Sequence, residues 1–168
     1  WLAKIWYQVT AIDVIEEKIQ LLKKGISPIY EAWLTELLHE VKDNIEFTTD
    51  KSSIPDADIV FLCVPTPQDE EGKTDLWYLR SACESIRPLL TGKEILIIKS
   101  TVPLGTNQMV YELLLKKNSI VSNPEFLREG LAVYDFFNPS RVLLGFHKDE
   151  QVTTREKVRE VYSYFSNK

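Results

Sequence analysis

Two carboxylates flank an arginine in the segment Ser122–Gly130, which reads SNPEFLREG. A proline ends the apolar run before the first carboxylate, and the glycine at the end of the segment permits a tight turn. A carboxylate at Glu125 can take or hold a proton, directly or through water, in general acid–base chemistry. Glu129 has a plainer alternative interpretation as an ion-pair partner of Arg128 or of another base.

Two further polar loops also follow apolar runs. VPTP at residues 64–67 holds Thr66 between two prolines, which shape the backbone in advance and fix the hydroxyl at the end of the run. A cofactor could lean against that hydroxyl, but a rigid exit loop explains the motif equally well. KSTVPLGT at residues 99–106 presents Thr101 near the start of a predicted helix, where hydroxyls and amide hydrogens can meet a polar ligand. Lys99 has the alternative of lying buried against the edge of the sheet.

A fourth candidate position lies near the N-terminus. Asp13 belongs to the short β-branched stretch QVTAIDV, and doubly wound dinucleotide folds place an acid here that accepts hydrogen bonds from the adenosine ribose. Lys18 follows about one helical turn later. The plainer alternatives are a helix cap for Asp13 and a solvated helix face for Lys18.

Strands and helices must alternate to position these residues, and the apolar patterns predict that they do. The predicted strands cover residues 8–14, 45–49, 58–64, 94–99, 119–123 and 141–146. The predicted helices cover residues 15–24, 27–41, 74–90, 106–117, 131–137 and 150–165. The run at 58–64 is apolar enough to be buried on both faces. This order favours an α/β fold with a Rossmann-like doubly wound parallel sheet, whose ligands bind at the carboxyl ends of the strands.

Composition bounds the possible partners. The 168 residues are 44% hydrophobic and 27% charged, which suffices for one domain with a sizeable core. A formal net charge of -5 gives no broad attraction to nucleic acid or anionic membranes, so we expect a small-molecule partner. The two cysteines, Cys63 and Cys83, fall in apolar patterns, which predicts core positions, no disulfide, no metal site and a reducing cytoplasm. No apolar run approaches the roughly 18 residues that cross a bilayer.

Together these motifs resemble the UDP-glucose and GDP-mannose dehydrogenase family over nearly the whole chain. The matching pieces are, in order, IDVIEEKI, LLKKGISPIYE, FTTD, ADIVFLCVPTPQDEEGKTDL, KSTVPLGT and SNPEFLREGLAVYDFFNPSRVLLG. Several long motifs in family order are far more specific than a lone glycine pattern. NPEFLREG is most similar to the UDP-glucose 6-dehydrogenase branch.

The resemblance implies an NAD-dependent oxidation of the sugar C6 alcohol to a carboxylate, through an aldehyde and a cysteine-bound thioester. It assigns adenosine-ribose contacts to Asp13 and Lys18. It places three residues along the dinucleotide: Thr66, Thr101 and Glu129. Glu125 matches the acid that transfers a proton during thioester hydrolysis. The segment contacting the UDP-sugar corresponds to Glu125, Phe126, Leu127 and Arg128.

Two parts of the family pattern have no match. The family opens with a strand and a GxGYVG loop that cradles the pyrophosphate, whereas WLAKIWYQ resembles only the helix after that loop. The nucleophilic cysteine belongs to a downstream domain. We therefore expect residues 1–168 to be a partial dinucleotide-binding domain without the central and C-terminal domains, inactive by itself. Because the missing strand is central in the usual order, two interior sheet edges should be unpaired unless their neighbours close up.

Three functional interpretations stay open. The first is part of a UDP-glucose 6-dehydrogenase, which converts UDP-glucose, two NAD+ and water to UDP-glucuronate and two NADH for polysaccharide biosynthesis. The second is a truncated, non-catalytic module that binds a nucleotide sugar or a partner. The third is a UDP-N-acetylhexosamine or GDP-mannose dehydrogenase. The complete enzyme of this family is expected to be a homo-oligomer.

Overall fold

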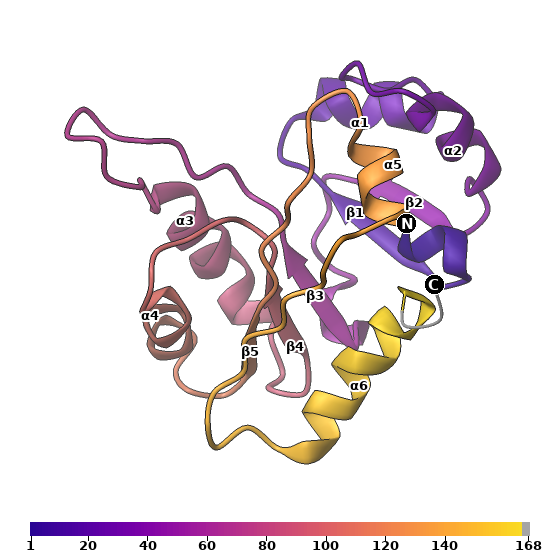
Figure 1. The fold of residues 1–168 in the computed structure, drawn as a ribbon. Helices are drawn as coiled ribbons and strands as arrows, with labels where there is room; N and C mark the ends of the chain where they lie inside the picture. Colours follow the sequence, from indigo (N-terminus) through magenta and orange to yellow (C-terminus); the bar gives the residue numbers. More distant parts are fainter. Residues whose placement is uncertain (166–168) are drawn as a thin grey trace. The chain divides into compact units, whose positions relative to one another are not determined.

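Parallel strands and connecting helices alternate in the structure, a computed structural model that describes residues 1–165 (Figure 1). The chain divides into two compact units. Unit 1 comprises Trp1–Lys51, Phe126–Ser140 and the residues from Glu160 onward. Unit 2 comprises Ser52–Glu125 and Arg141–Arg159. Each unit contains its own parallel sheet.

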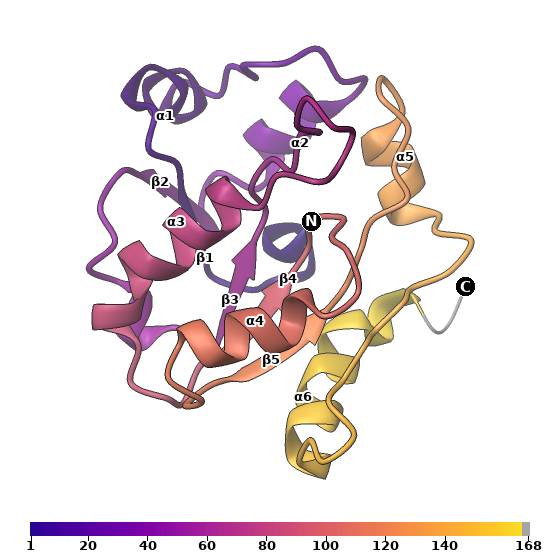
Figure 2. The ribbon, with the colours of Figure 1, turned by 90° about the vertical axis from the view of Figure 1, so that its left-hand side faces the viewer.

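Unit 2 is built on a three-stranded sheet in the order β3-β4-β5. Its strands are β3 (Ile59–Leu62), β4 (Ile95–Ile98) and β5 (Ser119–Ser122). The central strand β4, with the sequence ILII, is buried at all four positions. Its helices are α3 (Trp77–Ile86), α4 (Thr106–Leu113) and most of α6 (Val152–Tyr162), with short 3₁₀ turns at Ile54–Asp56 and Arg87–Leu89. Figures 1 and 2 show α3 and α4 on one side of this sheet and α6 on the other.

Helix α3 shows how the apolar pattern builds this core. Leu79, Cys83 and Ile86 recur at helical spacing, and all three are buried. The carboxylate of Asp75 accepts a hydrogen bond at 2.8 Å from the amide of Trp77, the first residue of the helix. Because Cys83 is one of these three buried residues, its predicted core position is confirmed.

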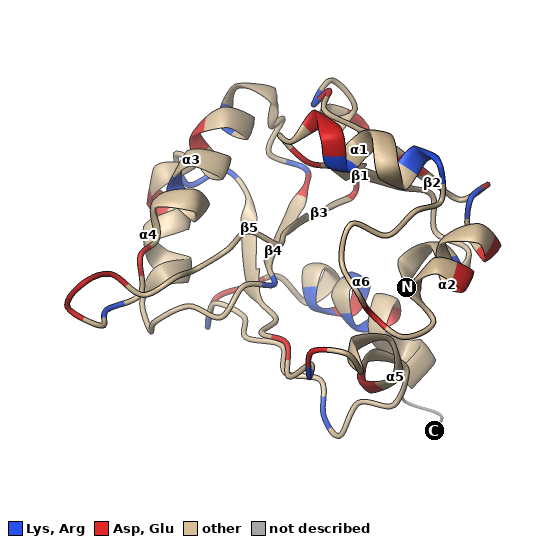
Figure 3. Ribbon diagram, turned by 90° about the horizontal axis from the view of Figure 1, so that it is seen from above, with Lys and Arg blue, Asp and Glu red and all other residues tan. Residues whose placement is uncertain are grey.

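Unit 1 is built on the two-stranded sheet of β1 (Val9–Ile12) and β2 (Ile45–Thr48). Its helices are α1 (Glu16–Lys23), α2 (Leu34–Glu40) and α5 (Ala132–Phe137), with 3₁₀ turns at Leu2–Ile5 and Ser163–Phe165. Acidic residues open α1 and a lysine closes it, which complements the helix dipole (Figure 3). An aromatic cluster joins the N-terminus to α5, with the rings of Trp1 and Phe136 4.6 Å apart.

The strand positions confirm the predicted α/β fold, but the sheet is divided. Among the described residues, β1 pairs with β2 alone and β3 pairs with β4 alone. Each of these strands therefore has a ladder on one side only. The predicted burial of 58–64 on both faces is wrong, because three of the four β3 residues are only half-buried. An edge strand lacks the flanking strand that would help to cover it.

Two predicted elements differ from the structure for local reasons. The helix predicted over 27–41 is formed only by α2, because the Ser27 hydroxyl bonds to the Ile29 carbonyl at 2.6 Å and Trp33 adopts a left-handed φ of 62°. The strand predicted over 141–146 is an isolated antiparallel bridge between Ser122 and Gly145. A Cβ at Gly145 would lie 3.2 Å from that of Ser122, so a small residue suits this close approach.

Candidate functional site

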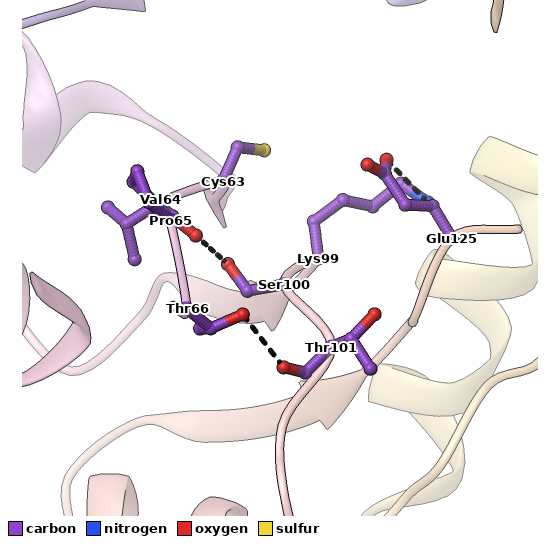
Figure 4. Close-up of a pocket in the computed structure, with 8 residues that line it drawn as sticks. All are labelled: Cys63, Val64, Pro65, Thr66, Lys99, Ser100, Thr101 and Glu125. Atoms are coloured by element: carbon purple, nitrogen blue, oxygen red, sulfur yellow. Dashed lines mark hydrogen bonds and ion pairs between the residues drawn. The ribbon is translucent and has the colours of Figure 1, made fainter. Parts of the chain in front are cut away.

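The carboxyl ends of β3, β4 and β5 meet at a pocket of about 260 Å³ in unit 2 (Figure 4). Its lining comprises Cys63, Val64, Pro65, Thr66, Lys99, Ser100, Thr101 and Glu125. Three of the residues predicted from the sequence, Thr66, Thr101 and Glu125, are thus brought together. Parallel strands end at one edge of their sheet, and this explains why loops far apart in the sequence share a pocket.

Hydrogen bonds tie the first two loops of the pocket to each other. Ser100 donates its hydroxyl proton to the Val64 carbonyl at 2.6 Å, and Thr66 donates to the Thr101 carbonyl at 3.0 Å. The Thr66 hydroxyl therefore serves the scaffold as a donor, while its oxygen keeps the capacity to accept a hydrogen bond. Ser100 is a positioning residue, because its hydroxyl holds the two loops together.

Asn123 anchors the third loop and was missed in the sequence analysis. Its side chain has 2% of its surface exposed and donates to the Leu143 carbonyl at 2.8 Å. Its backbone amide donates to the Ile98 carbonyl at 2.9 Å, which extends the hydrogen-bond ladder between β4 and β5 by one residue. Because Glu125 lies two residues beyond Asn123, this anchor fixes where the carboxylate enters the pocket. The signal available in the sequence was an asparagine directly after an apolar strand.

The charged pair of the pocket is Lys99 and Glu125, which extend toward each other in Figure 4. The Lys99 ammonium lies 3.8 Å from a Glu125 carboxylate oxygen and donates to the Asn123 carbonyl at 3.4 Å. Burial lowers the pKa of Lys99, and Glu125 opposes that shift. The alternative of a buried Lys99 is confirmed, since only 11% of its side-chain surface is exposed. The same lysine also faces the predicted acid.

Cys63 corrects the prediction of a second core cysteine. It lies one residue past β3, is exposed as a whole residue and lines the pocket. Its sulfur points toward the side of the pocket that holds Lys99 and Glu125 (Figure 4). Desolvation of the thiol raises its pKa to about 11, with Glu125 adding to the shift and Lys99 opposing it. The thiol is therefore protonated at neutral pH.

In unit 1, Asp13 directly follows β1 and pairs with Lys18. One Asp13 carboxylate oxygen accepts the Ile15 amide at 2.9 Å, which closes a local turn before α1; it does not cap the helix, because Ile15 is the N-cap and no side chain caps it. The other oxygen lies 3.4 Å from the Lys18 ammonium. Both side chains remain partly exposed, so the carboxylate keeps the capacity to accept further hydrogen bonds. Its ribose role stays a prediction.

The segment 126–129 also lies in unit 1, where Arg128 has a different partner from the one suggested. Its guanidinium binds the Asp135 carboxylate through two hydrogen bonds of 2.9 and 2.6 Å. The hydrogen bonds from Arg128 lower the pKa of Asp135 to about 2. The alternative ion pair of Glu129 with Arg128 is therefore wrong. Glu129 itself is exposed, and its predicted contact with the dinucleotide stays a prediction.

Residues 1–165 contain neither a cluster of metal ligands nor a membrane-spanning helix. No cluster of three or more histidine, cysteine, aspartate or glutamate side chains there could hold a metal ion. Within the same range, no helix has the length and apolar character needed to span a membrane.

Parallel strands with polar loops at their carboxyl ends define the class of nucleotide-cofactor-binding α/β proteins. The sequence model of the UDP-glucose/GDP-mannose dehydrogenase family, NAD binding domain, matches residues 1–166. The chain belongs to this family, and NAD is its cofactor.

Named relatives agree with this assignment. An uncharacterized protein of Methanocaldococcus jannaschii is 48% identical over 171 residues, covering 99% of this chain and 19% of the relative. UDP-glucose 6-dehydrogenase TuaD of Bacillus subtilis is 35% identical over 169 residues, covering 95% of this chain and 37% of the enzyme. The chain thus spans well under half the length of these relatives.

Solved structures share the fold. A UDP-glucose dehydrogenase from Pyrobaculum islandicum is 30% identical, with a TM-score of 0.85 over 96% of this chain and 40% of its own. A GDP-mannose dehydrogenase from Pseudomonas aeruginosa is 29% identical, with a TM-score of 0.84 over the same shares. Both structures support the Rossmann-like fold class of this chain. The two nucleotide-sugar dehydrogenases are almost equally similar to it.

The donor set of this chain fits a dinucleotide in part. The free lone pairs of Asp13 can accept from ribose hydroxyls, and the exposed Thr101 hydroxyl can donate or accept along the cofactor. The Thr66 oxygen can accept as well. The residues before β1 form a 3₁₀ turn, Leu2–Ile5, rather than a glycine-rich loop. The described residues therefore offer hydrogen-bonding groups suited to a ribose and to the strand-end part of a dinucleotide, but no glycine-rich pyrophosphate loop.

Proposed function

We propose that this chain is the cofactor-binding part of a UDP-glucose 6-dehydrogenase. Such an enzyme oxidises UDP-glucose to UDP-glucuronate, consuming two NAD+ and one water and releasing two NADH. The observation that carries the proposal is the placement of Glu125 beside Lys99 in the strand-end pocket that also contains Thr101. The NPEFLREG motif and the named UDP-glucose 6-dehydrogenase relatives support the choice of sugar.

Each residue has a role in this proposal that its surroundings allow. Bound NAD supplies the hydride acceptor. Asp13 and Lys18 hold the adenosine ribose, and three residues line the dinucleotide: Thr66, Thr101 and Glu129. Glu125 holds or moves a proton of the attacking water at its carboxylate, which is 47% exposed and so accessible to solvent. The sugar is contacted by the segment 125–128.

Arg128 takes a particular part in that segment. Because Asp135 binds its guanidinium, we propose that Arg128 is held in a fixed position within that segment before a sugar nucleotide binds. Phe126, in the same segment, is 58% exposed. The remaining catalytic groups would come from parts of the protein beyond this segment, as the 37% coverage of TuaD suggests.

A second candidate differs only in the sugar nucleotide. The similarity to the GDP-mannose dehydrogenase structure nearly equals that to the UDP-glucose dehydrogenase structure, so GDP-mannose is the competing substrate. A UDP-N-acetylhexosamine is a further substrate of the same class. A chain that only binds a nucleotide sugar or a partner, without catalysis, is the remaining candidate.

The test is a titration of the 168-residue chain followed by amide NMR. NAD+ should shift the signals of Thr66 and Thr101, and UDP-glucose should shift those of residues 125–128 more than GDP-mannose or UDP-N-acetylglucosamine does. A stronger response to GDP-mannose would overturn the sugar assignment. Failure of NAD+ to shift either threonine would overturn the cofactor contacts. Steady NADH production by this chain alone would contradict its proposed inactivity in isolation.

A further inference from the structure

A carboxylate far away in the sequence holds the turn that follows the sugar-contacting segment. Glu31 accepts the backbone amide of Gly130 at 2.8 Å with one oxygen and that of Ala132 at 3.1 Å with the other. The partners lie 99 and 101 positions apart in the chain, and all three belong to unit 1. Hydrogen bonds from amides to an ionised carboxylate are stronger than those to a neutral acceptor.

These amides need an external acceptor because of where they lie. Ala132 begins α5, and the first amides of a helix have no acceptor within the helix. Gly130 has a φ of +78°, which a side chain would strain. The turn is therefore shaped by a residue that permits it and by a carboxylate that binds it from outside.

A second carboxylate fixes the same segment from the other end. The Arg128 backbone amide donates to Asp135 at 3.0 Å, in addition to the guanidinium contacts. The Leu131 amide donates to the Arg128 carbonyl at 3.0 Å, which closes the turn. Arg128, Gly130 and Ala132 thus direct their amides onto two carboxylates, and the segment has a defined shape without a ligand.

We propose that Glu31 is a positioning residue for the sugar-contacting segment, holding the Gly130–Ala132 turn so that Phe126–Arg128 are preorganised for a nucleotide sugar. This inference rests on the proposed function. Glu31 acts only through the turn and touches no reacting group. Its loss should therefore weaken nucleotide-sugar binding, while NAD+ binding at the strand-end pocket of unit 2 is retained.

The experiment compares Glu31→Gln with Glu36→Gln in the 168-residue chain. Glutamine keeps the size of the side chain but leaves only one accepting oxygen for two amides. Glu36 is an exposed residue of α2 in the same unit and serves as the matched control. In Glu31→Gln, amide exchange at Gly130 and Ala132 should accelerate about tenfold, the scale of losing one hydrogen bond to a charged group. Exchange at Ile97 and Val121 should not change.

Binding measurements distinguish a positioning role of Glu31 from a purely local role in capping the turn. The Kd for UDP-glucose should rise about tenfold in Glu31→Gln, while the shifts that NAD+ causes at Thr66 and Thr101 remain. Gly130→Ala disturbs the same turn through its positive φ, with no heavy atom within 4 Å of the added Cβ, and should weaken UDP-glucose binding as well.

The outcomes distinguish the two proposals. Unchanged exchange at Gly130 and Ala132 in a folded Glu31→Gln chain would overturn the positioning role. Faster exchange with an unchanged Kd for UDP-glucose would also overturn it and leave the proposed function intact. If the wild-type chain binds NAD+ but no nucleotide sugar, the proposed sugar contacts fail, and the substrate role of Glu31 fails with them.

Discussion

Glu94 is a buried carboxylate on which one end of the unit 2 sheet depends. It directly precedes β4, and 1% of its surface is exposed. Its oxygens accept hydrogen bonds from the Thr91 hydroxyl at 2.7 Å, the Gly92 amide at 3.0 Å and the Asn118 side chain at 3.0 Å. Because Asn118 precedes β5, this carboxylate connects the beginnings of two neighbouring strands.

The size of its contribution follows from its pKa. Burial alone would raise the pKa of Glu94, but the hydrogen bonds from Thr91 and Asn118 outweigh it and lower the pKa from 4.5 to about 2. The difference of about 2.5, at 1.36 kcal/mol for each pKa unit, corresponds to about 3.4 kcal/mol. Glutamine keeps one of the two accepting oxygens, so we expect Glu94→Gln to lose only part of this value, about 2 kcal/mol.

The direction of the pH dependence follows from the lowered pKa. A carboxyl group whose folded-state pKa lies below its unfolded value stabilises the fold above the unfolded value, here 4.5. That stabilisation is lost as the pH falls through the folded value of about 2. Glu94→Gln removes the titration and one acceptor. The variant should therefore be less stable than the wild type by about 2 kcal/mol at pH 7 and nearly equal to it at pH 2.

Urea unfolding followed by circular dichroism at pH 7, 4 and 2 measures this difference. Glu84→Gln, an exposed position on α3, is the control and should leave the free energy of unfolding unchanged within about 0.5 kcal/mol. A deficit of Glu94→Gln that stays constant with pH would refute the role of the ionised carboxylate. Equal stability at pH 7 would refute the hydrogen-bond argument altogether.

Three further predictions concern the pocket and its cofactor. The rate of Cys63 alkylation by iodoacetamide should rise with pH according to a pKa of about 11. The midpoint should fall in Glu125→Gln and rise in Lys99→Met, and Cys63→Ser is the control. An ordinary midpoint near 9 would contradict the desolvation argument. Asn123→Ala should destabilise the chain by about 2 kcal/mol in thermal unfolding, because it removes a buried side chain together with its hydrogen bond to the Leu143 carbonyl, and an unchanged Tm would count against that anchor. Asp13→Asn should weaken NAD+ binding about tenfold in calorimetry without affecting UDP-glucose, and equal NAD+ affinity would remove Asp13 from the ribose site.

Local pattern was sufficient wherever a segment's own residues decide its structure. The run ILII can only be a buried strand beside its neighbours, and the recurrence of Leu79, Cys83 and Ile86 specifies α3. Parallel topology then places the loops after the strands at one edge, which is why Thr66, Thr101 and Glu125 could be predicted to meet.

Local pattern failed where a distant partner decides the structure. Nothing near Glu31 in the sequence indicates that its carboxylate binds amides about a hundred positions away. Arg128 lies beside Glu129, yet folding brings the carboxylate of Asp135 into bidentate geometry with it instead. Cys63 belongs to an apolar run that is typical of a protein core. However, β3 ends one residue before it, and Cys63 lines the pocket.

The short strand β3 has a consequence for handling the protein. Its sequence, IVFL, is apolar and without charge, and among the described residues its only ladder is with β4. Segments of this kind pair with other extended chains when partial unfolding exposes them. Self-association under mildly unfolding conditions should therefore begin at β3, and a lysine in place of Val60 would act as a gatekeeper against it.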